Sequence, residues 1–152
     1  MSAHGDKSYV EMRKPLVIFI ILFLISGCKS PKRIYNNVCI GVPKHFQEEV
    51  LKKNSAKDDN YTLLYFTENF SNDKIVVSNN NVILFENYIS SVEGLGFASV
   101  TRIDNNFETD ILYKNKNYHF KIEKNKYKFI YVSKTDKNRF IIKYSDSFCG
   151  FR

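Results

Sequence analysis

Residues 109–133, TDILYKNKNYHFKIEKNKYKFIYVS, contain the clearest pattern of secondary structure in the chain. Alternation is clearest at residues 118–122, where Tyr118, Phe120 and Ile122 share one side and His119 and Lys121 share the other. A period of two is typical of a β-strand with one buried face. The linkers at 114–116 and 124–126 both read Lys-Asn-Lys, which is hairpin length, and Asn tolerates the positive φ of tight turns. The stretch therefore predicts consecutive antiparallel strands.

The same pattern of short runs of β-branched and aromatic residues extends from residue 61 towards the C-terminus. Eight runs are separated by Asn, Asp and Lys, at 61–67, 74–78, 82–86, 97–103, 109–113, 117–123, 127–133 and 139–144. No helix-length segment lies between them, which argues against parallel βαβ units. We expect an all-β fold, an antiparallel β-sandwich or a partly open barrel.

Two segments refine this expectation. Residues 44–53 follow Pro43, place Phe46 and Val50 four residues apart and end on two lysines, which predicts one short amphipathic helix. Residues 127–133 are apolar on both sides, with Tyr127, Phe129 and Tyr131 on one and Ile130 and Val132 on the other. A strand of this kind is more typical of a central core position than of a carbohydrate-binding surface.

Length and composition limit the class of protein. The chain has 152 residues, 43% hydrophobic and 26% charged, with six Gly and three Pro. These values fit one compact domain and exclude wholesale disorder and collagen-like repeats.

The N-terminal region resembles the signal peptide of bacterial lipoproteins. Arg13 and Lys14 precede ten apolar residues, 16–25, and Ile25-Ser26-Gly27-Cys28 matches the lipobox at all four positions. Ten apolar residues suit a signal-peptide core, whereas a membrane span needs about 20. The resemblance implies cleavage after Gly27 and lipidation of Cys28. Residues 1–11 do not resemble a signal peptide, and we expect Met12 to be the true start.

Location and domain boundaries follow from that resemblance. We expect a signal peptide at 1–27, a lipidated tether at 28–37 and a single β-rich domain at 38–152. More than one acyl chain is needed for stable anchoring, and the acylation of this family supplies it. The residues after Cys28 are basic rather than acidic, which by analogy with enterobacterial lipoproteins implies the periplasmic face of the outer membrane. The composition of the mature domain is similar to that of small uncharacterised envelope lipoproteins of AT-rich Gram-negative bacteria, a likeness that transfers no function.

Two cysteines remain once Cys28 is lipidated. Cys39 and Cys149 lie near opposite ends of the mature chain. In an oxidising compartment such a pair favours a disulfide over a metal or redox site, with two free thiols as the alternative.

Sequence patterns of catalysis are scarce. The mature chain has two histidines, His45 and His119, without metal-ligand spacing, and it contains no CxxC and no GxSxG. We therefore name no catalytic residue, no zinc site and no cofactor. A weak Ca²⁺ candidate has oxygen side chains at alternate positions, and a polar turn is the favoured interpretation because the spacing lacks the Gly and Glu of a calcium loop. Its members are Asp104, Asn106, Glu108 and Asp110.

Two parts of the domain carry opposite net charges. Residues 45–110 carry a net charge of −6, and residues 114–143 carry +8. A basic surface can contact nucleic acid, anionic lipid or an acidic partner, but export makes nucleic acid a poor candidate, and Lys-rich strands also protect sheet edges from aggregation. The weak partner surface comprises Lys114, Lys116, Lys124, Lys126 and Lys128.

These observations favour a membrane-anchored, non-catalytic binding module whose partner is an envelope protein or the anionic lipid surface. The alternative is a small-ligand carrier, or a hydrolase whose carboxylates come from distant strands. A pocket above about 300 Å³ with two acidic groups about 5–10 Å apart would favour that alternative.

Overall fold

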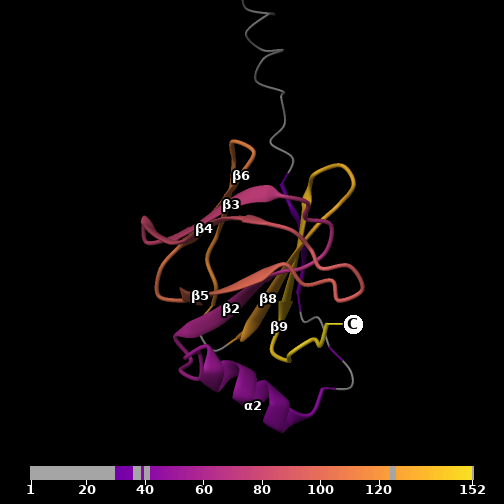
Figure 1. Cartoon of the computed structure of the whole chain (residues 1–152). Coiled ribbons are helices and arrows are strands. Elements are labelled where there is room, and N and C mark those ends of the chain that lie inside the picture. Colours follow the sequence, from indigo (N-terminus) through magenta and orange to yellow (C-terminus); the bar gives the residue numbers. More distant parts are fainter. Residues whose placement is uncertain (1–29, 36–38, 40–41, 124–125, 152) are drawn as a thin grey trace, which may run out of the picture. The chain divides into compact units, whose positions relative to one another are not determined.

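The computed structural model describes residues 30–35, 39, 42–123 and 126–151 (Figure 1). Contacts divide the chain into Met1–Ser30 and Pro31–Arg152, and the elements described all belong to the second unit. They are β1 (Lys32–Ile34), α2 (Lys44–Lys53), β2 (Tyr61–Phe66), β3 (Asp73–Asn79), β4 (Val82–Ile89), β5 (Ser99–Asp104), β6 (Thr109–Tyr113), β7 (Lys116–Phe120), β8 (Phe129–Lys134) and β9 (Phe140–Ser145).

The strands form two sheets. The five-stranded sheet has the order β1-β9-β8-β2-β5, and the four-stranded sheet has the order β4-β3-β6-β7. Antiparallel pairs predominate, the sheets are not closed into a barrel, and α2 is the single helix of the described residues. The predicted all-β, sandwich-like fold with one short helix is confirmed.

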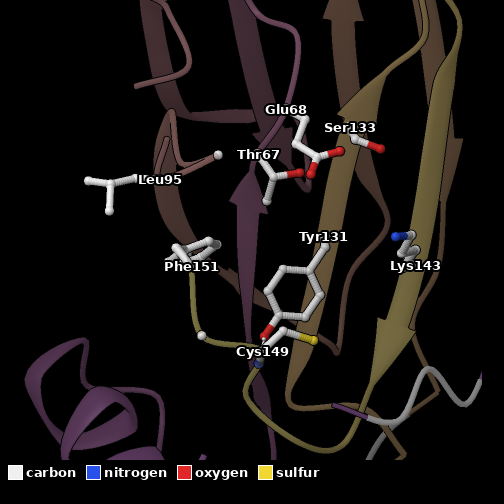
Figure 2. Close-up of a pocket in the computed structure, with 10 residues that line it drawn as sticks. Thr67, Glu68, Leu95, Tyr131, Ser133, Lys143, Cys149 and Phe151 are labelled. Carbon is white, nitrogen blue, oxygen red and sulfur yellow. Dashed lines mark hydrogen bonds between the residues drawn. The ribbon is translucent and has the colours of Figure 1, made fainter. Parts of the chain in front are cut away.

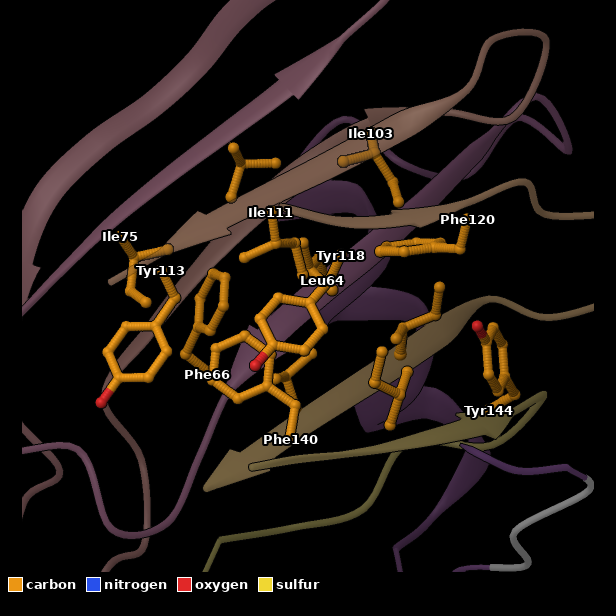
Figure 3. Packing of buried hydrophobic residues seen from close by; sticks show 14 of the residues in the cluster. Leu64, Phe66, Ile75, Ile103, Ile111, Tyr113, Tyr118, Phe120, Phe140 and Tyr144 are labelled. Atoms are coloured by element: carbon orange, nitrogen blue, oxygen red, sulfur yellow. The ribbon is translucent and has the colours of Figure 1, made fainter. Parts of the chain in front are cut away.

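The larger core lies between the two sheets (Figure 3). Tyr118, Phe120 and Ile122 all point into it, as their alternation predicts, while His119 and Lys121 are exposed. Facing side chains from the other sheet include Leu64, Phe66 and Phe140. This interior is filled with aromatic and branched side chains, as expected of a packed sandwich core.

A second core covers the opposite face of the five-stranded sheet. Leu51 of α2 and Phe148 of the C-terminal segment pack there against Tyr65, Phe129 and Tyr131. The five-stranded sheet is therefore covered on both faces, which explains why all six residues of β8 are buried. The prediction of a central core strand is confirmed.

Tyr127 differs from its predicted place. It precedes β8 and packs in the core between the sheets, close to Tyr144, instead of sharing a face with Phe129 and Tyr131. Strand alternation holds only inside the strand, and the chain enters β8 through a bend at residue 128.

Two strand pairs within these predominantly antiparallel sheets are parallel. β2 pairs in parallel with β8, and β1 pairs in parallel with β9. A parallel pair needs a long connection. Here strands β3 to β7 supply it between β2 and β8, so no crossover helix is required.

β1 lies within the segment 28–37, for which a tether is the expectation. Lys32–Ile34 forms three register pairs with β9, and the Arg33 guanidinium donates a hydrogen bond of 3.0 Å to the His119 carbonyl. Three residues without apolar alternation carry no strand signal of their own. Their pairing is decided by the open edge of β9, which the sequence does not reveal.

Candidate functional site

A pocket of about 270 Å³ opens on the outer face of the five-stranded sheet (Figure 2). Strand order places β8 between β2 and β9, so side chains following β2 and within β9 flank the side chains of β8. We call it the Glu68–Lys143 pocket. It is lined by Thr67, Glu68, Leu95, Gly96, Tyr131, Ser133, Lys143, Cys149, Gly150 and Phe151.

Tyr131 forms the rigid floor of this pocket. Its ring stacks on Tyr65 with centroids 5.5 Å apart, and its hydroxyl accepts a hydrogen bond of 2.7 Å from the Cys149 amide. Burial raises the pKa of the Tyr131 hydroxyl above its ordinary range and the pKa of Tyr65 to about 12. Both phenols are therefore neutral at physiological pH, and neither serves as a base there.

Two opposite charges flank this floor. Glu68 follows β2 and is exposed, whereas Lys143 lies in β9 and is half-buried. Neither makes an ion pair with any other described residue. Figure 2 shows Glu68 beside Thr67 and Ser133, with Tyr131 below them and Lys143 to one side of Tyr131.

Backbone geometry keeps space beside the Glu68 carboxylate. Gly96 has φ +61°, and a Cβ at this position would lie 3.5 Å from Glu68 Cγ and 3.8 Å from Oε1. Positive φ favours glycine, so the turn places its bare backbone against the pocket wall.

The C-terminal wall of the pocket is joined to the start of the domain. The structure links Cys39 to Cys149 as a disulfide, with Cα atoms 4.9 Å apart and 110 residues of separation. This is the predicted pairing. Because Cys149 lies in the pocket wall and donates its amide to Tyr131, the disulfide fixes the wall as well as the chain ends.

A buried polar cluster lies at the C-terminal end of β8, on the side that faces the four-stranded sheet. Lys134 forms an ion pair with Asp73 of β3, and the Tyr113 hydroxyl donates to the same carboxylate over 3.1 Å. Burial opposes ionisation of Asp73, but hydrogen bonds from Lys134 and the Ser71 amide hold the pKa of Asp73 below its ordinary value. The cluster connects the two sheets, and the sequence analysis did not find it.

The acidic stretch at 104–110 has internal partners. Asp104 Oδ1 accepts hydrogen bonds from the amide and side chain of Asn106, at 2.8 and 2.7 Å. Glu108 and Asp110 both face His119, at 3.4 and 2.9 Å. Among the described residues, no group of three or more His, Cys, Asp or Glu side chains is placed to hold a metal ion.

Among these groups, His119 has an acidic partner at each ring nitrogen. Its Nδ1 is hydrogen-bonded to Asp110, which raises its pKa above the ordinary value with further help from Glu108. Asn117 donates to the same Asp110 oxygen at 2.9 Å. This exposed cluster holds a positive charge more firmly than a free histidine does.

The described lysines of the predicted partner surface have different surroundings. Lys128 donates to the carbonyls of Lys57 and Asp58 and pairs with Asp59 at 2.7 Å, so it closes the loop before β2. Lys126 pairs with Glu123, and Lys114 lies over the Tyr113 ring. Lys116 is exposed on the edge strand β7.

Lys124 and the lipidation residue Cys28 lie outside the described residues. Within the described part of the chain, no helix has the length and apolarity needed to cross a membrane. The chain matches no protein-family model, no curated protein and no solved structure.

Proposed function

We propose that this chain is a lipid-anchored lipoprotein of a bacterial envelope that works by binding, without catalysis. The lipobox residues Ile25-Ser26-Gly27-Cys28 support the anchor, and the outer membrane facing the periplasm remains the expected site. The Cys39–Cys149 disulfide supports an oxidising compartment.

The observation that carries the binding proposal is the edge strand β4. It pairs with β3 on one side, and no strand described in the structure pairs with its other side. Val82, Ile83 and Tyr88 are 60%, 58% and 61% exposed, so apolar side chains stand on an open strand edge. Such an edge can accept an extended segment of a partner through main-chain hydrogen bonds. We assign this edge to an envelope protein partner.

Two experiments test the proposal. The anchor is tested by the intact mass of the membrane-extracted protein: a chain that begins at Cys28 and carries acyl groups supports it, and an unprocessed, unacylated chain contradicts it.

The partner surface is tested by a photo-crosslinking residue at Ile83 in envelope preparations, with exposed Lys137 as the matched control position. Adducts specific to position 83 are expected, and equal labelling at both positions would refute the β4 assignment.

A small-ligand carrier is the second candidate, because the Glu68–Lys143 pocket combines charge, hydroxyl and aromatic groups. The alternative of a hydrolase has less support from the pockets. The two carboxylates that share a pocket, Glu108 and Asp110, line about 230 Å³ and are both engaged with His119. The larger pocket, about 350 Å³, contains Asp73, which is paired with Lys134.

A further inference from the structure

The Glu68–Lys143 pocket holds opposite charges on opposite sides of an aromatic floor, and neither charge is ion-paired with another described residue. The Glu68 carboxylate can bind an ammonium group, and the Lys143 ammonium group can bind a carboxylate. We infer that this pocket binds a short apolar peptide through its free amino and carboxyl ends. The inference is independent of the lipid anchor and of the β4 edge.

The hydroxyl groups of the pocket agree with a polar ligand. Ser133 is 8% exposed and lines the pocket, yet its hydroxyl makes no hydrogen bond to the described residues. The hydroxyl is reached by solvent rather than fully buried, so it can exchange a hydrogen bond with a ligand in the pocket. Thr67 already donates to the Val132 carbonyl at 3.2 Å, which leaves its oxygen able to accept from an ammonium group.

Strand spacing sets the length of the ligand. Glu68 follows β2 and Lys143 lies in β9, with β8 between them, which is two strand spacings, or about 10 Å, across the sheet. Lys143 pairs with Tyr131, whereas the Lys134 amide donates to the Glu68 carbonyl, so the two residues are also offset by three residues along β8. An extended peptide advances about 3.3 Å per residue. A peptide of two or three residues is about 7–10 Å long when extended, which is comparable to the separation across the sheet, whereas a single amino acid is shorter than it.

The remaining walls favour apolar side chains. Leu95 and Phe151 stand on the side of the pocket away from Lys143 (Figure 2). Phe151 also packs on Tyr65 and Tyr131, with ring centroids 5.3 and 6.4 Å apart, so contacts with other aromatic rings hold this wall in place. Leucyl-leucine is therefore a suitable probe.

Calorimetric titration of the full-length, detergent-extracted chain with leucyl-leucine tests the inference. We expect Glu68→Gln to weaken binding about tenfold or more, because a hydrogen bond to a charged group is lost. The same substitution should leave binding of N-acetyl-leucyl-leucine unchanged. Lys143→Met should weaken leucyl-leucine by a similar factor and leave leucyl-leucinamide unchanged.

Controls separate ligand contact from folding. Glu49→Gln on α2 and Lys137→Met before β9 remove the same charges from exposed positions outside the pocket, and both should bind like the parent chain. Melting temperatures of all variants are measured in parallel. Absence of binding by the parent chain at millimolar peptide, or an equal loss for capped and free peptides, would overturn the inference. Leucine binding as tightly as leucyl-leucine would overturn the assignment to a peptide.

Discussion

At the scale of single residues, the ion pair between Asp73 and Lys134 is the buried charge pair of the described residues. It joins β3 of one sheet to β8 of the other, and both side chains are largely buried. Removing one partner leaves a buried charge uncompensated, which costs about 3–5 kcal/mol. We expect Asp73→Asn to lower the free energy of unfolding at pH 7 by about that amount, measured by denaturant titration.

The pH dependence of this pair has a definite sign. Folding lowers the pKa of Asp73, so its stabilisation is fully present above the unfolded value of about 3.9 and is lost as the pH falls through the folded pKa. The difference between the parent and Asp73→Asn should therefore shrink below about pH 4. The exposed pair Lys74–Glu86 is the matched control, and Glu86→Gln should have a far smaller effect. A constant difference at all pH values would contradict this account.

His119 gives the second prediction at this scale. Its hydrogen bond to Asp110 and the nearby Glu108 raise its pKa, so the imidazole should titrate above its ordinary value. Asp110→Asn should return the pKa towards that value, as followed by NMR of the imidazole protons. The raised pKa stabilises the fold below the unfolded pKa, and this contribution disappears as the pH rises through the folded one. An unchanged titration in Asp110→Asn would refute the pairing.

Sequence reasoning found some of these residues and missed others for a physical reason. Cys39 and Cys149 could be paired because few thiols remain in the mature chain. Glu68 and Lys143, or Asp73 and Lys134, are ordinary charged residues far apart in the sequence, and no local period connects them. Their meeting depends on strand order, and the parallel pairing of β2 with β8 was not predicted.

At the scale of elements, the strands and hairpins were predicted mainly from the alternation of apolar and polar residues and from the residue types of the turns. The hairpin between β3 and β4 illustrates this, because Asn80 and Asn81 both adopt positive φ, 51° and 61°. Two consecutive residues of this kind suit the turn that follows the twist of antiparallel strands. By contrast, the short strand β1 has no internal pattern, and its existence depends on the edge of β9.

Asn81 therefore gives a prediction about turn chemistry. A β-branched residue in the left-handed region costs about 1–2 kcal/mol, so Asn81→Val should destabilise the protein by about that amount. Asn81→Gly should be close to neutral. Asn87→Val, at an exposed position in the strand β4 itself, is the control and should have little effect. Thermal unfolding measures all three, and similar losses at positions 81 and 87 would contradict the turn argument.

At the scale of the whole molecule, the proposed function gives two kinds of cysteine separate roles. The disulfide Cys39–Cys149 closes a loop of 110 residues that contains α2 and strands β2 to β9, and in the chain-entropy model such a loop stabilises by about 4–5 kcal/mol. Cys28 lies beyond the described residues, and the lipobox resemblance assigns it to the membrane anchor. Stability and attachment should therefore respond to different cysteine substitutions.

The last prediction follows from this separation. Cys39→Ser should lower the free energy of unfolding by several kcal/mol, and reductant should lower that of the parent chain but not of the variant. Cys28→Ser should leave the unfolding curve unchanged and move the protein from the membrane fraction to the soluble fraction. Because Cys149 also fixes the pocket wall through Tyr131, Cys39→Ser should weaken leucyl-leucine binding even at temperatures where the domain stays folded. A Cys28→Ser chain that remains membrane-bound would contradict the anchor, whereas unchanged stability in Cys39→Ser would contradict the disulfide, and each result leaves the other claim standing.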